Sequence, residues 1–210
     1  MVKSFLHSFR RDDSGAALTE GLLVFPIMLL VLAITVEFSA ALMQWSKLVK
    51  ASQIAGRLAS VSSPLTDISA LEITPAGRVM GDAMSDAAIS VACGHGTGTA
   101  CDAAALARLH QGSDATCGTV TNGMIGVCDV AGFVPAANIR VTYSNGGLGY
   151  VGRAAGPVAI VTVSIHDIPF NFFMLDRVFA LVGGSQSALT LPSFPVTFVG
   201  EDLSSCEGCT

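Results

Sequence analysis

The strongest pattern along the chain is a long apolar stretch near its N-terminus. Residues 21–36 contain no charged side chain, and the apolar character continues to Met43. The stretch from Ala16 to Met43 therefore exceeds the roughly 20 apolar residues that a membrane-spanning helix needs. Trp45 follows it, and tryptophan is enriched at membrane–water interfaces. We expect a helix that crosses a membrane and leaves it near Trp45.

The helical pattern continues beyond this stretch. Ala51, Ile54, Leu58 and Val61 recur at spacings of three and four, so they share one face of a helix. The sequence Ser-Ser-Pro at 62–64 predicts the end of that helix. We therefore expect one long N-terminal helix, half in lipid and half on a globular head. Its apolar stripe packs either against that head or against a partner's helix.

The rest of the chain predicts a mixed head. Small and apolar residues step by four from about 76 to 91, which favours a second helix. From residue 138 the period changes to two: 139–143 alternates, and 158–165 is rich enough in β-branched residues for a central strand. A third strand at 189–199 contains two prolines, which confine it to an edge or split it. Two helices followed by three antiparallel strands give an α+β fold.

Between these strands, residues 169–175 form a strongly apolar connecting segment. It is either a lid over the core or an exposed patch for a partner. Nothing in the sequence separates the two alternatives.

Composition narrows the class of protein. The chain has 210 residues, of which 51% are hydrophobic and 13% charged, and its net charge is −5. Nucleic-acid binding requires a cationic surface, so this composition argues against a nucleic-acid partner. Three basic residues, Lys3, Arg10 and Arg11, precede the apolar stretch and predict a cytoplasmic N-terminus. We expect a single-pass membrane protein whose N-terminus is cytoplasmic and whose part after Trp45 lies outside the cytoplasm.

The cysteines agree with this orientation, because all six follow the apolar stretch. An even number confined to the exported part predicts disulfides rather than the reduced core thiols of a cytosolic protein. Many pairings are possible, and the local ones close the shortest loops. These local pairs are Cys93–Cys101, Cys117–Cys128 and Cys206–Cys209.

Three kinds of N-terminal segment compete for the first 45 residues. A cleaved secretory signal has an apolar core of about 7–15 residues, which is shorter than this one. A plain anchor leaves Glu20 unexplained, because a carboxylate inside an apolar run is costly. A basic leader that ends at Gly15, with glutamate as the fifth residue after it, has the layout of a type IV prepilin-like signal. Cleavage would create an amine on Ala16, and Glu20 is placed to pair with it or with a neighbouring chain's amine.

Residues 15–60 resemble the TadE-like family of minor pilins or pseudopilins from tight-adherence (Flp-type) pilus systems. The matching features are Gly15, Glu20, Pro26, the leucine-rich run and the Val-Glu-Phe sequence at 36–38. Pro26 removes a helical hydrogen bond and is expected to kink the helix. Glu37, at the far end of the run, is expected as a solvated carboxylate at the membrane interface.

The resemblance implies a leader at 1–15, a transmembrane helix at 16–45 and a pilin-like periplasmic head at 46–210. It implies a non-catalytic subunit that primes or supports pilus assembly, in the membrane or in the extracellular fibre. The implied partners are a prepilin peptidase, a second minor pilin as heterodimer partner, the major Flp-type pilin and the inner-membrane assembly platform.

No constellation of residues predicts an enzyme, a metal or a cofactor. The glycines around His95, between Cys93 and Cys101, fit neither phosphate-binding pattern, and a zinc site there would be one ligand short. Adjacent residues on a strand point to opposite faces, so His166 and Asp167 are not expected to orient each other.

The pair Cys206 and Cys209 has thiol–disulfide spacing but lies at the C-terminus, which favours a staple. The alternative function is a bitopic inner-membrane protein with an uncleaved anchor and a disulfide-rich periplasmic domain. That domain would bind a ligand or perform thiol redox chemistry.

Overall fold

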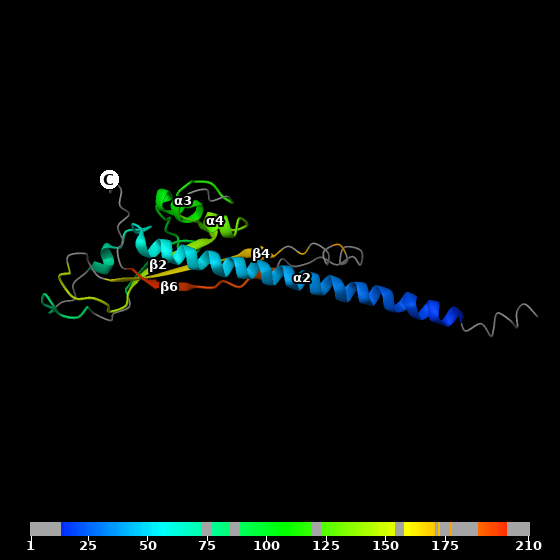
Figure 1. Cartoon of the computed structure of the whole chain (residues 1–210). Coiled ribbons are helices and arrows are strands. Elements are labelled where there is room, and N and C mark those ends of the chain that lie inside the picture. The colour runs from blue at the N-terminus through cyan, green and yellow to red at the C-terminus, as the bar shows by residue number, and fades with distance from the viewer. Residues whose placement is uncertain are drawn as a thin grey trace, which may run out of the picture. The chain divides into compact units, whose positions relative to one another are not determined.

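The computed structural model describes residues 14–72, 77–84, 89–118, 123–153, 158–170, 172, 177 and 189–200. The chain divides into two compact units, Met1–Leu42 with Asn171–Ser187 and Met43–Phe170 with Ala188–Thr210. The helical elements are α2 (Ser14–Val61), η1 (Ser69–Glu72), α3 (Ala103–Gln111), α4 (Val127–Val130) and η2 (Ala136–Asn138). The strands are β1 (Ser90–Gly94), β2 (Ile139–Asn145), β3 (Ala159–Ile165), β4 (Ile168–Phe170), β5 (Leu189–Leu191) and β6 (Val196–Val199) (Figure 1).

Helix α2 is the long N-terminal helix that the apolar pattern predicts. It runs for 48 residues and contains Pro26. A bend at Ser62 and then Pro64 follow its last residue, as the Ser-Ser-Pro sequence indicates. The predicted α+β class is confirmed, because this helix is followed by a further helix and antiparallel sheets.

The main sheet has four antiparallel strands in the order β1-β2-β3-β6, and β4 and β5 form a second, two-stranded sheet. The strands predicted at 139–143 and 158–165 are β2 and β3, and β3 is central as its β-branched sequence indicates. The proline-containing strand is split into β5 and β6, with both prolines between them. This placement fits the missing N–H of proline, which cannot donate to a sheet ladder.

The helix predicted at 76–91 is wrong in its described part. Gly77 and Gly81 have φ values of +83° and +93°, which a right-handed helix does not contain. Backbone hydrogen bonds tie this segment to a neighbouring loop instead, from Gly81 N–H to the Val151 carbonyl and from Val151 N–H to the Asp82 carbonyl. The last residues of the predicted helix belong to strand β1. The spacing of four between small and apolar residues therefore did not indicate a helix.

The further helix is α3. Asp102 caps its N-terminus, because the side chain accepts a hydrogen bond from the Ala105 N–H. The Gly112 N–H closes its C-terminus on the Arg108 carbonyl. The capping aspartate and the closing glycine are both helix-boundary signals in the sequence.

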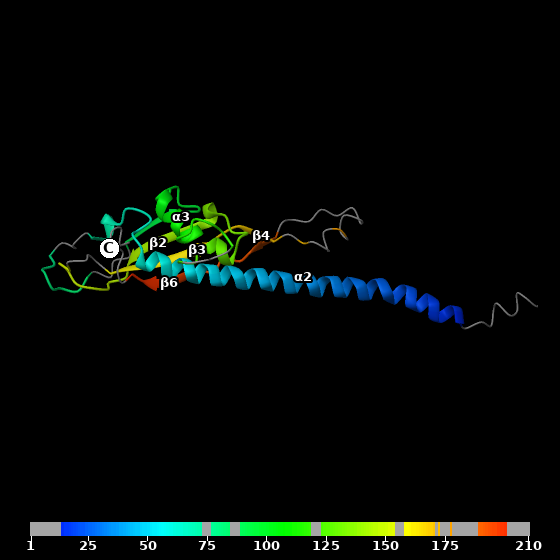
Figure 2. The ribbon, with the colours of Figure 1, turned by 45° about the horizontal axis from the view of Figure 1, so that its top comes forward.

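The core lies between the C-terminal half of α2 and one face of the main sheet (Figure 2). The helix contributes small residues, and Ala51, Ala55 and Ala59 are all fully buried. A side chain at Gly56 would meet the ring of Phe198 on β6 at 2.6 Å. Small residues therefore let the helix approach the strands closely. Facing it, the buried side chains of β2 and β3 include Val141, Tyr143, Val161 and Val163.

The apolar segment 169–175 is described in part. Pro169 and Phe170 belong to β4, and Phe170 is buried at 5% exposure. Of the remaining positions, 171 and 173–175 lie outside the described residues. Its first residues are therefore sheet residues rather than a free connecting loop.

Candidate membrane-spanning and assembly helix

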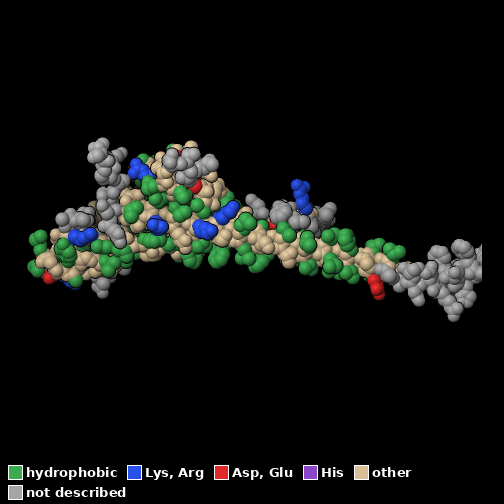
Figure 3. Space-filling model, in the orientation of Figure 1, with side chains coloured by type: hydrophobic (Ala, Val, Ile, Leu, Met, Phe, Trp, Pro, Cys, Tyr) green, Lys and Arg blue, Asp and Glu red, His purple; other side chains and the backbone are tan. Residues whose placement is uncertain are grey.

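The N-terminal part of α2 exposes large apolar side chains all around the helix. Among them, Leu22 is 73% exposed, Met28 66% and Phe38 64%. Figure 3 shows hydrophobic side chains along this whole part of the helix. Within the described part of the chain, Leu18–Val61 is the one segment long and apolar enough to cross a membrane. An apolar surface of this size is unfavourable in water, and its length matches that of a single membrane anchor.

The residues predicted for processing and assembly lie at the start of this helix. Gly15 is the second residue of α2 and is exposed, with open space where a side chain would be. Glu20 is also exposed, less than two helical turns further along. The side chain of Ala16 lies outside the described part. An exposed Glu20 is accessible to a group on its own chain or on a neighbouring one, and its pairing role stays a prediction.

Pro26 lies inside α2, and the helix continues through it. Membrane helices tolerate proline because neighbouring groups satisfy the freed carbonyl. The kink at Pro26 stays a prediction.

Glu37 differs from its sequence prediction. It is 2% exposed and not solvated. The helical period explains its position, because Glu37 lies one turn beyond Ala33, which is 5% exposed, on the same face of α2. Leu48 and Ala55, which lie 11 and 18 residues beyond Glu37 and so about three and five turns along the helix, are buried on the same face. The sequence interpretation used the distance of Glu37 from the end of the apolar stretch and neglected the face of the helix on which it lies.

Two disulfides join the cysteines of the described head. Cys93 is bonded to Cys101 and Cys117 to Cys128, with Cα–Cα distances of 5.0 and 5.3 Å. Cys206 and Cys209 lie outside the described residues. A third histidine, His110, lies close to the second disulfide. The bonded sulfurs are not thiolates, and the His110 ring nitrogen makes a 2.8 Å hydrogen bond with the Val134 carbonyl, so this group does not form a zinc site.

A cluster of polar side chains links the Cys93–Cys101 loop to the corner between β3 and β4. The Nε2 of His95 lies 2.9 Å from the Oδ2 of Asp167. The ring of His95 stacks on His166, with centroids 5.4 Å apart. His166 Nε2 lies 2.9 Å from the hydroxyl of Ser164. Burial lowers the pKa of His166, its electrostatic interactions with His95 and Arg140 lower it further, and Asp167 opposes them.

Sequence reasoning missed this cluster. It treated His166 and Asp167 as strand residues, whereas β3 ends before them and Asp167 has a φ of +51°. No sequence signal pairs His95 with a residue so distant along the chain. Ser164 is only 9% exposed, so the arrangement does not present a nucleophile to a substrate. We interpret the cluster as a structural tie between the disulfide loop and the sheet.

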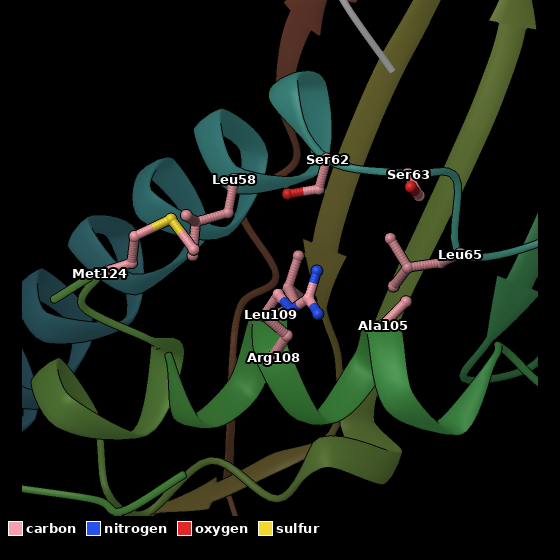
Figure 4. Close-up of a pocket in the computed structure, with 8 residues that line it drawn as sticks. All are labelled: Leu58, Ser62, Ser63, Leu65, Ala105, Arg108, Leu109 and Met124. Carbon is pink, nitrogen blue, oxygen red and sulfur yellow. The ribbon is translucent and has the colours of Figure 1, made fainter. Parts of the chain in front are cut away.

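The cavity between the end of α2 and α3 is too small for a ligand. Figure 4 shows a cavity in which Leu58, from the end of α2, lies near Met124 and faces Leu109 of α3. Its volume is about 20 Å³, which is the space of about one water molecule. A larger, open groove of about 570 Å³ runs beside it, and apolar residues line most of it, together with Arg57 and Ser60.

The comparison with known proteins identifies a family for helix α2. No curated protein and no solved structure matches the chain. One family model, described as TadE-like protein, matches residues 15–57. The matched segment begins at Gly15 and covers α2 to within a few residues of its end. The chain thus carries a TadE-like family domain at residues 15–57.

Proposed function

We propose that this chain is a minor pilin or pseudopilin of a tight-adherence (Flp-type) pilus, a non-catalytic subunit that primes or supports pilus assembly. The observation that carries the proposal is the coincidence of the TadE-like segment with the exposed apolar helix α2. The small-residue face of the same helix holds the head, which makes α2 both the anchor and the backbone of the subunit.

The proposed processing step is cleavage after Gly15 by a prepilin peptidase. Gly15 offers no side chain to block access to the peptide bond. Cleavage removes the basic leader and leaves a new amine on Ala16. Glu20 then lies one helical turn from this amine, and an ion pair reduces the cost of holding either charge in an apolar environment. Exposed Glu20 is also placed to pair with the amine of an adjacent subunit.

The proposed partners follow from this mechanism. They are the prepilin peptidase, a second minor pilin in a heterodimer, the major Flp-type pilin and the inner-membrane assembly platform. The lipid bilayer surrounds α2 before assembly, and neighbouring pilin helices replace it in the membrane complex or the fibre.

The proposed orientation places the N-terminus in the cytoplasm and the head at residues 46–210 in the periplasm. Charge alone does not decide it, because three Lys or Arg residues precede the apolar stretch and three follow within 12 residues of Trp45. The two disulfides favour the periplasmic head, because disulfides persist in oxidising compartments.

The Glu20→Gln variant tests the pairing mechanism, because it removes the charge and keeps the size of the side chain. We expect loss of pilus assembly and of co-purification with the partner pilin, with normal membrane insertion. Ser39→Ala is the matched control, since Ser39 is an exposed polar residue of α2 whose hydroxyl bonds only its own helix, at the Thr35 carbonyl. Normal assembly of Glu20→Gln would show that charge pairing is not the mechanism. It would favour the alternative of a bitopic envelope protein with an uncleaved anchor.

A further inference from the structure

Just after the apolar stretch that ends at Met43, one exposed face of helix α2 carries basic side chains instead of apolar ones. Met43, Lys47, Lys50 and Arg57 follow one another at spacings of four, three and seven, so they share one face of the helix. All four are exposed. Their face points away from the buried small residues, including Ala51 and Ala55, that pack against the sheet. Figure 3 shows Lys and Arg side chains along this part of α2.

The three cations have no anionic partner in the described part of the chain. Among the described residues, the charged pair at salt-bridge distance is His95 with Asp167, which does not involve this face. Within the part of the chain that the structure describes, no hydrogen bond involves the charged end of Lys47, Lys50 or Arg57. A cationic stripe on an acidic protein, without partners among the described residues, is complementary to an external anion.

The position of the lysines along the helix indicates which anion. With a rise of 1.5 Å per residue, Lys47 and Lys50 lie about 3 Å and about 7.5 Å beyond Trp45 along the axis, and Arg57 about 18 Å. The headgroup layer of a bilayer is about 5–8 Å thick on each side of the hydrocarbon. If the hydrocarbon ends near Trp45, both lysines lie in the headgroup layer and Arg57 lies beyond it.

We propose that Lys47 and Lys50 form a binding site for the phosphate groups of anionic phospholipids at the membrane surface on the head side of α2. The proposal rests on the proposed membrane-spanning role of α2 and adds the lipid class that surrounds its outer end. Flexible ammonium groups suit phosphates as point charges. The site holds the junction between helix and head at the headgroup level, while the apolar side chains of α2 remain in the hydrocarbon.

Trp45 is the sole tryptophan of the chain and lies at this junction, so its fluorescence reports the local lipid. The full chain is reconstituted in phosphatidylcholine bilayers that contain a fixed fraction of brominated phosphatidylglycerol or of brominated phosphatidylcholine. Bromine quenches tryptophan nearby, and the ratio of the two quenching efficiencies measures local enrichment of the anionic lipid. The variants are the double substitution Lys47→Gln with Lys50→Gln and, as matched control on the same face, Arg57→Gln.

We expect brominated phosphatidylglycerol to quench Trp45 more strongly at low salt, because each lysine favours an anionic surface by roughly fivefold. The excess should fall as salt rises, vanish in the double variant and persist in Arg57→Gln. Equal quenching by the two lipids in the wild-type chain overturns the site and would favour an acidic protein surface as partner of the stripe. An equal loss in Arg57→Gln also overturns it, because general charge attraction then explains the excess. Absence of quenching by either lipid contradicts the membrane-spanning role itself.

Discussion

The turn that follows α2 is held by Tyr143, and this contact gives a quantitative test of how the helix is fixed to the sheet. Tyr143 lies on β2 and is fully buried. Its hydroxyl oxygen accepts a 3.0 Å hydrogen bond from the Leu65 N–H. The Leu65 carbonyl accepts a second bond, of 2.7 Å, from the Asp102 N–H at the start of α3. Leu65 therefore joins the end of α2 to both the sheet and the next helix.

The Tyr143→Phe substitution keeps the ring and removes the acceptor. It leaves the buried Leu65 N–H without its partner, which costs about 1–3 kcal/mol in free energy of unfolding. For a head of this size, 1 kcal/mol corresponds to about 2–4 °C in melting temperature. We therefore expect the melting temperature to fall by about 4–8 °C for a central cost of about 2 kcal/mol.

Thermal unfolding of the full chain in detergent, followed by near-ultraviolet circular dichroism, measures this change. Hydrogen exchange at the Leu65 amide reports the broken bond directly. Tyr150→Phe is the matched control, because Tyr150 is the only other tyrosine and is 51% exposed. We expect that variant to change stability by less than about 0.5 kcal/mol. If Tyr143→Phe melts like the wild type and the Leu65 amide stays protected, the hydrogen bond does not hold the turn.

Removing the Cys93–Cys101 disulfide by Cys101→Ser should lower the stability of the head by about 2–3 kcal/mol, because the open loop gains conformational entropy in the unfolded chain. A melting temperature that reductant and substitution leave unchanged would refute the loop's structural role. Because the pKa of His166 is lowered in the folded head, protons bind more tightly to the unfolded chain, so stability present at neutral pH should decline as pH falls below about 6.5. His166→Gln should reduce this acid-induced loss in melting temperature, and an unchanged pH profile would show that His166 does not contribute. Burial raises the pKa of Tyr143 to about 12, so its ionisation, followed by ultraviolet absorbance, should begin only well above pH 10 and accompany loss of the fold.

The elements that the sequence predicts correctly are those whose pattern comes from one repeated environment. Helix α2 exposes large apolar side chains over most of its N-terminal part, and β2 alternates strictly between buried and half-buried positions. In each element, the spacing of apolar and polar residues along the sequence shows the period of the secondary structure. Prolines likewise act locally, which is why the split between β5 and β6 followed from the sequence.

The incorrect predictions concern residues whose structure depends on contacts with distant parts of the chain. Strand β1 has only five residues, and it is a strand because β2 pairs with all of them. Its serine, alanine and glycine residues carry little strand preference of their own. The His95–Asp167 pair and the burial of Glu37 depend equally on tertiary packing, which a single sequence does not display.

The intact mass of the protein extracted from the membranes of its native host tests the proposed function most directly. The account predicts a mass that lacks residues 1–15, leaving the 195 residues from Ala16 onward apart from the hydrogens lost in disulfides. A Gly15→Leu variant should keep its leader, because the bulky side chain occupies the cleavage position. A full-length mass for the wild-type chain would contradict prepilin-type processing and leave an uncleaved membrane anchor as the role of α2.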